Sequence, residues 1–199
     1  MSKLIKRINS KIFDFYFKNQ FRFRKRFFLE RSKANLIGSP IIKQPSLFIG
    51  DGTINFGDLV QLGYYPSPYF FSGYSHLEAR NKESQINFGN DIIINNNLVI
   101  IAEKNVSICN NVLIGTNVEI YDSDFHSVLK NRRGNKNHSI SPVLIKENVW
   151  IGSNVKILKG VEIGENTVIS NSSVVTKSFP SNVIIGGIPA KIISNIDND

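Results

Sequence analysis

One histidine lies where an imidazole could accept a proton. His126 belongs to the stretch DSDFHS, two residues after Asp124 and four after Asp122. The pKa of an unperturbed imidazole is about 6.5, so the neutral ring can act as a base near neutral pH. A carboxylate beside such a ring can orient its other nitrogen. We therefore predict His126 as a general base, with Asp122 or Asp124 as its orienting group.

Candidates for metal or thiol chemistry are few. The chain holds three histidines and one cysteine, which is too little material for a structural zinc site, so we expect no metal. The nearest pair of histidines, His126 and His138, falls within one segment, and His76 receives no role. Nothing near Cys109 in the sequence would lower the pKa of its thiol, so we interpret it as a small packing residue.

Composition bounds the class of protein. The chain has 199 residues, 41% hydrophobic and 20% charged, which fits one folded domain with an appendage. No apolar run approaches the roughly 18 residues of a membrane span, and the first residues make a poor secretory signal. One cysteine excludes an intrachain disulfide. We expect a cytoplasmic protein.

The positive charge gathers near the N-terminus. The net charge is +8, and residues 1–33 carry eleven Lys and Arg against two acidic residues, which leaves −1 for the remainder. Seven of the fourteen Phe residues lie in the same stretch, without Pro or Gly, which favours a helix. Two interpretations stay open: the helix lies on an anionic membrane, at the inner membrane face, or its Phe side packs on protein. Confinement of the charge to this arm argues against nucleic acid as the partner.

A period of six residues organises most of the chain. Neither a helix, with 3.6 residues per turn, nor a plain strand explains such a period. Short strands joined by turns do, if each step sends one aliphatic side chain inward, which predicts an all-β solenoid. The inward positions include Phe88, Ile94, Ile100, Val106, Val112 and Val118, and later Ile145, Ile151, Ile157, Ile163, Ile169 and Val175. The corners needing unusual φ are Asn148, Asn154, Gly160, Asn166 and Ser172.

Interruptions of this period divide the chain. Residues 64–85 and 121–142 break it, and we expect both to extrude as loops, which is where binding chemistry gathers. The register also shifts by two residues between Ile100 and Ile108. The expected organisation is a basic aromatic arm over 1–47, a solenoid over 48–193 and a tail over 194–199.

The repeats and three motifs resemble the hexapeptide-repeat acetyltransferases, in particular the maltose/galactoside and polysaccharide O-acetyltransferase branch. The motifs are DSDFHS at 122–127, NVWIGSN at 148–154, and SVVTK followed by GGIPAKII. The resemblance implies a left-handed parallel β-helix, a homotrimer with active sites between subunits, and acetyl-CoA as the co-substrate. It implies direct attack of a sugar hydroxyl on the thioester, with His126 as base. The implied acceptor is a cell-surface or capsular polysaccharide or its precursor, since the arm replaces the cap domain of the maltose and galactoside enzymes.

The resemblance also implies the remaining site residues. The backbone N–H of Ser153 would stabilise the oxyanion. Asn95, Glu103 and His138 would contact the saccharide acceptor. The residues implied to contact acetyl-CoA are Trp150, Gly152, Ser153, Asn171, Thr176, Lys177 and Lys191.

Three other functions are compatible with a solenoid of this kind to different degrees. N-acetylation of an amino sugar would use the same histidine and stays open. A metal-dependent hydratase resembling the γ-carbonic anhydrases would need several His ligands on adjacent coils, which three scattered histidines do not supply. A scaffold without catalysis would need neither His126 beside two aspartates nor Lys177 and Lys191 near the end.

Overall fold

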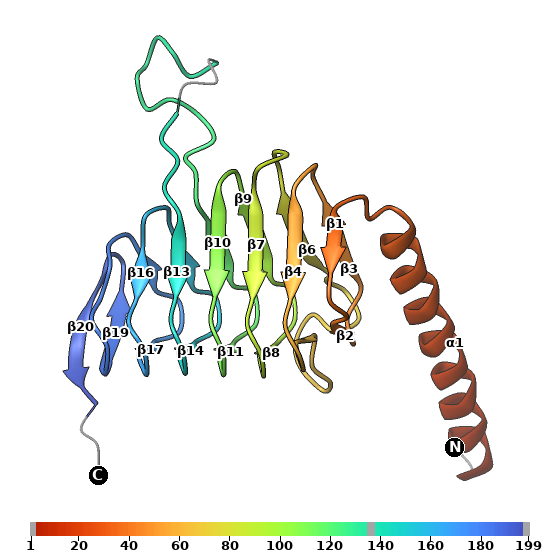
Figure 1. Cartoon of the computed structure of the whole chain (residues 1–199). Helices are drawn as coiled ribbons and strands as arrows, with labels where there is room; N and C mark the ends of the chain where they lie inside the picture. The colour runs from red at the N-terminus through yellow and green to blue at the C-terminus, as the bar shows by residue number, and fades with distance from the viewer. Residues whose placement is uncertain (1–2, 135–137, 197–199) are drawn as a thin grey trace.

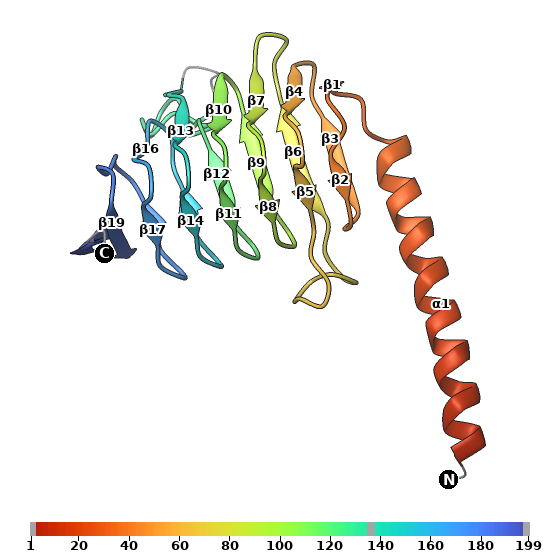
Figure 2. The ribbon, with the colours of Figure 1, turned by 60° about the horizontal axis from the view of Figure 1, so that its bottom comes forward.

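The structure is a computed structural model that describes residues 3–134 and 138–196. One long helix, α1 (Lys3–Glu30), precedes a stack of coils that runs from β1 to β20 (Figure 1). The chain visits three sheets in turn, so each coil has a triangular cross-section. Figure 2 shows the successive coils stacked side by side, with α1 beyond the first of them. All strand pairs are parallel except the last, β19 with β20. This arrangement is the parallel β-helix expected from the six-residue period.

The three sheets are named A, B and C in the order in which each coil enters them. Sheet A contains β1 (Asn35–Ile37), β4 (Thr53–Phe56), β7 (Gln85–Phe88), β10 (Asn105–Ile108), β13 (Val143–Ile145) and β16 (Glu162–Ile163). Sheet B contains β2 (Ile41–Ile42), β5 (Gln61–Leu62), β8 (Ile93–Ile94), β11 (Leu113–Ile114), β14 (Trp150–Ile151), β17 (Val168–Ile169), β19 (Val183–Gly187) and β20 (Ala190–Asn195). Sheet C contains β3 (Ser46–Ile49), β6 (Ser75–Ala79), β9 (Val99–Ala102), β12 (Glu119–Tyr121), β15 (Lys156–Ile157) and β18 (Val174–Val175).

The core is a set of stacked aliphatic ladders. Ile151 pairs with Ile169, and Ile157 pairs with Val175, each one coil further along. Every inward position named from the sequence is at most 4% exposed. Burying such a side chain stabilises the fold by about 1.5–3 kcal/mol. The hydrophobic effect thus fixes the register of successive coils.

The corners follow the predicted turn residues. The φ angles of Asn148, Asn154, Gly160, Asn166 and Ser172 are 55°, 59°, 75°, 58° and 60°. Asparagine and glycine tolerate this left-handed region better than most residues. The predicted corners are therefore confirmed.

The two-residue shift of the period is a longer corner. Phe88 pairs with Ile108, whereas Ile145 pairs with Ile163, so the earlier coil is two residues longer. The extra residues are Glu103 and Lys104, which lie between β9 and β10. This corner lies one coil before the start of the long loop between β12 and β13.

Two expected boundaries need correction. The solenoid was expected from residue 48, but β1 and β2 already pair with β4 and β5, so coils begin at Asn35. The interruption over 64–85 contains β6, where Leu77 is fully buried and pairs with Phe48. Only the part between β5 and β6 extrudes at that position, because Leu77 and Ala79 bury their side chains in the core. We call residues 63–74 the first excursion.

The long loop over 121–142 does leave the stack, between β12 and β13 (Figure 1). Its two ends run side by side, joined by an antiparallel bridge between Ser123 and Ile140. Residues 135–137 of the loop lie outside the described residues. The final residues 197–199 do so as well, and β20 occupies the start of the expected tail. We call residues 122–142 the extruding loop.

The helix α1 packs with one side on the first excursion. The ring of Phe21 stacks on that of Phe70, and the ring of Phe28 stacks on that of Tyr74. The guanidinium of Arg24 donates to the carbonyls of three successive excursion residues, with 3.1 Å to Ser72 and 3.0 Å to Gly73. None of the described helices is long and apolar enough to cross a membrane.

Candidate active site

His126 is exposed on the extruding loop, with one ring nitrogen already bonded. Its Nδ1 lies 3.1 Å from the carbonyl oxygen of Arg133. A carbonyl can only accept a hydrogen bond, so this contact requires the proton on Nδ1. The lone pair of Nε2 is then available to accept a proton. The carbonyl of Arg133, and not a carboxylate, thus orients the ring.

The two aspartates expected to orient His126 have other partners. Asp122 is fully buried and its carboxylate accepts the backbone N–H groups of Glu103, Lys104 and Asn105 at 2.7–2.8 Å. The carboxylate of Asp124 forms an ion pair with Lys159 at 3.4 Å. Both contacts hold backbone or loop in place, so the expectation that either side chain orients the imidazole is corrected.

Glu103 and His138, expected to contact the acceptor, instead bind each other. Nε2 of His138 donates to Oε2 of Glu103 in a short contact, and Ser123 Oγ donates to the same oxygen at 2.7 Å. The second oxygen of Glu103 accepts from Arg80 at 3.2 Å. The side chains of Glu103 and His138 are only 8% and 10% exposed. In this chain the two side chains bind each other, and His138 also lines a pocket beside Asp124 and Ser139, so their contact with an acceptor stays a prediction.

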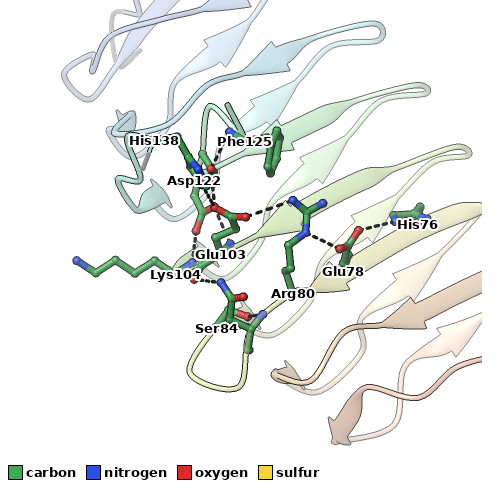
Figure 3. A network of polar contacts seen from close by, with 11 residues as sticks. His76, Glu78, Arg80, Ser84, Glu103, Lys104, Asp122, Phe125 and His138 are labelled. Carbon is green, nitrogen blue, oxygen red and sulfur yellow. Dashed lines mark hydrogen bonds and ion pairs between the residues drawn. The ribbon is translucent and has the colours of Figure 1, made fainter. Parts of the chain in front are cut away.

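This polar network continues onto strand β6 (Figure 3). Nε of Arg80 donates to Glu78 at 2.7 Å, and the other oxygen of Glu78 lies 3.3 Å from Nε2 of His76. The guanidinium of Arg80 also lies 4.7 Å from the ring centroid of Phe125. One chain of charges therefore links sheet C to the residue that precedes His126.

The charges in this network stabilise one another. Burial raises the pKa of Glu103, but hydrogen bonds from His138 and Ser123 and the positive charges nearby outweigh it and lower that pKa. Burial likewise opposes the bonds from Arg80 and His76 to Glu78, and the pKa of Glu78 is lowered overall. The hydrogen bond to Glu78 raises the pKa of Arg80. Both carboxylates are thus ionised at neutral pH.

A second group of site residues lies on the outer face of sheet B. Trp150, 56% exposed, pairs with Leu113, which pairs with Ile93. Together with Asn95 and Tyr64 these side chains line a shallow pocket of about 240 Å³. Trp150, predicted to contact acetyl-CoA, and Asn95, predicted to contact the acceptor, thus line the same pocket.

Ser153 and Asn171 lie at stacked corners and are bonded to each other. The N–H of Ser153 donates to Oδ1 of Asn171 at 2.8 Å. Ser153 Oγ in turn accepts from the N–H of Thr116 at 3.2 Å. The expected oxyanion donor therefore already has an acceptor within the chain, and its role towards an oxyanion stays a prediction. A Cβ on Gly152 would lie 2.4 Å from Oδ1 of Asn171, so close packing explains this glycine.

The remaining predicted cofactor contacts lie near the C-terminal coils. Thr176, Lys177 and Lys191 are all exposed. The Nζ of Lys177 lies 5.6 Å from the ring centroid of Phe179. Lys191 belongs to β20, opposite Gly186 of β19. These cations could meet the phosphates of a ligand, and no described residue neutralises them in an ion pair.

A single chain does not bring all these residues together. The extruding loop with His126 leaves the corner between sheets C and A. Trp150 and Asn95 belong to sheet B or the residue after it, on the side opposite that corner. No group of three or more His, Cys, Asp or Glu suited to hold a metal is found among the residues that the structure describes.

Sequence reasoning missed the contribution of β6. His76, Glu78 and Arg80 alternate in the sequence, which is the pattern of one outward face of a strand. This alternation indicates a strand, but the strand is not predicted when residues 64–85 are interpreted as a loop. The part played by the Arg133 carbonyl has no comparable signal, because any residue carries a carbonyl.

Known proteins share this fold and parts of this sequence. A family model described as bacterial transferase hexapeptide (six repeats) matches residues 142–177. A protein of Escherichia coli K12 named "Putative lipopolysaccharide biosynthesis O-acetyl transferase WbbJ" is 32% identical over 169 residues, 80% of either chain. The galactoside O-acetyltransferase of the same strain is 41% identical over 115 residues, 58% of this chain and 56% of that protein. The chain thus spans a little over half the length of the latter.

A solved structure extends the comparison to three dimensions. Galactoside acetyltransferase in complex with coenzyme A matches with a TM-score of 0.53 and 28% identity, over 79% of this chain and 64% of that one. Together with the three parallel sheets, this likeness confirms the left-handed parallel β-helix predicted from the sequence.

Proposed function

The chain belongs to the hexapeptide-repeat transferase family, and on this basis we propose that it is an acetyl-CoA-dependent O-acetyltransferase. The proposed acceptor is a sugar hydroxyl of a cell-surface or capsular polysaccharide or its precursor. The observation that carries the proposal is the state of His126. Its Nδ1 is bonded to a carbonyl, and its Nε2 has no hydrogen-bond partner among the described residues of a loop that extrudes from the solenoid. The name of WbbJ supports a polysaccharide acceptor.

In the proposed reaction His126 moves one proton. Acetyl-CoA supplies an acetyl group activated as a thioester. Nε2 of His126 accepts the proton of the sugar hydroxyl as the hydroxyl oxygen bonds to the carbonyl carbon. When the carbon–sulfur bond breaks, the same nitrogen returns the proton to the departing thiolate. The histidine ends the reaction as it began.

A covalent acetyl-enzyme is not part of this proposal. The chain has one thiol, Cys109, and it is half-buried at a corner between β10 and β11. Burial and the negative charge of Glu147 raise the pKa of this thiol. It is therefore a poor nucleophile.

The residues near the C-terminal coils fit a phosphate-bearing ligand. Lys177 and Lys191 present two exposed ammonium groups, as CoA phosphates require. We propose that these residues, with Thr176 and Trp150, hold acetyl-CoA. Asn171 and Ser153 would support this surface through the bond between them.

We further propose a homotrimer with active sites between subunits. His126 and Trp150 lie on opposite sides of the triangular coil, so one chain alone cannot offer both to one ligand. A neighbouring copy could bring its sheet B against the extruding loop. Sheet B carries the apolar outer ladder of Ile93, Leu113 and Trp150, each 45–56% exposed, which such a contact would cover.

Peripheral contact with an anionic membrane, at its inner face, is the proposed role of α1. One side of this helix packs on the first excursion, but Ile12, Phe15 and Phe23 on the other side are 63–73% exposed. Lys18 and Arg22, which flank this apolar side, are exposed as well. Each basic residue near an anionic surface contributes about 1 kcal/mol of binding free energy. Residues 1–2 of the proposed arm 1–33 lie outside the described residues.

The first test is a calorimetric titration of the purified chain with acetyl-CoA. We expect micromolar binding that weakens at least tenfold in the Lys177→Ala/Lys191→Ala variant. Lys43→Ala/Lys82→Ala removes two exposed charges elsewhere and serves as the matched control. Absence of binding by the folded chain would contradict the proposal.

Acceptors are then screened by release of CoA thiol. Bacterial polysaccharides, their oligosaccharides and amino sugars form the panel, and His126→Ala is the control. We expect this variant to bind acetyl-CoA normally and to lose most turnover. If this variant turned over as fast as the unaltered chain, His126 would not be the base. Transfer only to amino sugars would favour N-acetylation.

A further inference from the structure

One oxygen atom of Glu103 holds both ends of the extruding loop. Oε2 accepts from Ser123 at the start of the loop, at 2.7 Å, and from His138 near its end. These two residues are fifteen positions apart in the sequence, so one carboxylate adds a side-chain link to the backbone bridge that joins the two ends of the loop. Oε1 of Glu103 binds Arg80, which lies one coil earlier.

The loop also holds the corner that presents Glu103. The buried carboxylate of Asp122 accepts three successive N–H groups of that corner, beginning with the N–H of Glu103 itself. Glu103 occurs in the two-residue lengthening of this coil. A corner of ordinary length would lack these two residues. Loop and corner therefore fix each other.

The residue before His126 has a strained backbone. Phe125 has a φ of 60°, a value that bulky side chains rarely adopt. Three contacts hold it there: its N–H donates to Ser123 Oγ at 3.0 Å, Arg80 lies over its ring, and Tyr121 meets its ring edge to face at 5.7 Å. Strain of this kind persists only where the surroundings impose it, and it gathers at functional sites.

We infer that Glu103, through Ser123, His138 and Arg80, is a positioning residue that fixes His126 for proton transfer. We call these four residues with Phe125 the loop clasp. Arg80 and Ser123 contact both Glu103 and Phe125, so the clasp ends one residue from the proposed base. The inference deepens the proposed function and rests on it, since it assigns Glu103 and His138 to the base and not to the acceptor.

The test uses the imidazole nitrogens directly and needs no acceptor. The full chain is labelled with ¹⁵N-histidine, and its three imidazoles are assigned by replacing each histidine with Gln. We expect His126 to carry its proton on Nδ1 and His138 to carry its proton on Nε2. In Glu103→Gln we expect His126 to lose this single tautomer and to show averaged nitrogen shifts. Glu83→Gln alters an exposed carboxylate at the corner before β7 and should leave the spectrum unchanged.

A second variant separates positioning from folding. Phe125→Gly removes the backbone strain and the ring contacts, so we expect averaged His126 signals without loss of thermal stability. Leu59→Gly relieves a similar φ of 57° at a distant corner and is its control. Arg80→Gln breaks the loop clasp at the hydrogen bond between Arg80 and Glu103. It is used in place of Glu103→Gln if that variant does not fold.

Kinetics add a second readout. Misplacement of a base by about 1 Å can lower turnover on the order of 100-fold, so we expect kcat to fall at least tenfold in Glu103→Gln with KM for acetyl-CoA unchanged. A fixed His126 tautomer in folded Glu103→Gln and Phe125→Gly would overturn the inference. Because the spectrum does not depend on turnover, failure of the proposed acetyl transfer would be recognised separately, by absence of acetyl-CoA binding.

Discussion

The backbone N–H of Ser153 and Oδ1 of Asn171 lie 2.8 Å apart, one coil from each other. Similar bonds join Asn90 to Asn110 and Asp58 to Asn90 at earlier corners. A side-chain oxygen thus satisfies the amide that each corner leaves unpaired. The interaction between Ser153 and Asn171 belongs to this corner ladder.

Loss of the Asn171 amide should therefore reduce stability. We expect Asn171→Ala to lower the free energy of unfolding by about 1 kcal/mol, because the Ser153 N–H loses its acceptor. In a chain of this length such a change lowers Tm by about 2–4 °C, measurable by calorimetry. Asn171→Asp keeps the oxygen and should remain near the unaltered Tm. An unchanged Tm in Asn171→Ala together with weaker acetyl-CoA binding would restore Asn171 as a ligand contact.

The proposed shared site predicts complementation between inactive variants. His126→Ala and Trp150→Ala should each lose most turnover, while mixed trimers regain some sites with one intact residue from each partner. A trimer that contains both variants has one of its three sites intact, so we expect the mixed trimers to show about a third of the unaltered activity. Co-expression with two different tags, followed by purification through both, supplies the mixed trimers. Mixed trimers no more active than either parent would contradict a site formed between subunits.

The exposed side of α1 should determine membrane binding. We expect the chain to sediment with vesicles that contain phosphatidylglycerol, and less at high salt, because screening weakens attraction between charges. Phe15→Ser/Phe23→Ser should abolish sedimentation without loss of acetyl-CoA binding. Ile37→Ser changes an exposed apolar residue of β1 and serves as the control. Equal sedimentation of both variants would show that the exposed side of α1 does not bind the membrane.

Ionisation of Glu103 predicts how acid affects stability. Its folded-state pKa lies below the ordinary value of 4.5, so its stabilising contribution is present above that pH and is lost as pH falls through the lower folded pKa. We expect Tm to exceed that of Glu103→Gln at pH 7 and the difference to shrink in acid. Calorimetric Tm values for both proteins between pH 7 and strong acid measure this. A difference independent of pH would show that the charge of Glu103 does not stabilise the fold.

The thiol of Cys109 should react slowly with Ellman's reagent in the folded protein. Burial and Glu147 raise its pKa, so little thiolate is present at pH 8. We expect rapid reaction only after denaturation, which also makes the thiol-release assay free of background. Glu147→Gln should speed the reaction modestly. Rapid reaction of the native chain would show that this corner opens.

The core could be predicted from the sequence because one physical rule governs it. Each coil buries an aliphatic side chain at a fixed spacing, so the burial of residues such as Ile151 and Ile157 can be predicted from their positions. The coil containing Leu77 was not predicted, because the inserted residues of the first excursion shift Leu77 out of the six-residue period. Periodicity can identify a repeat but not the point where an insertion ends.

The site was only partly predictable, for a related reason. The motif containing His126 is local, whereas its surroundings depend on contacts across coils. Arg80 and Glu103 lie 23 residues apart yet share a hydrogen bond because their corners stack. Asp122 is near His126 in the sequence but faces the corner of Glu103 instead. Proximity along a chain does not determine direction in a coil.

The helix α1 also protects the open end of the sheets. Its Lys25 donates to the carbonyl of Ile42 at 2.7 Å, and Ser32 after it accepts the N–H of Phe48 at 3.0 Å. Without the helix, the first coil would present unpaired strand edges to any other chain with a matching end. A chain lacking α1 would therefore be prone to join end to end into filaments. The helix that we propose to contact a membrane thus also prevents the coils of a second chain from stacking on the first coil of this one.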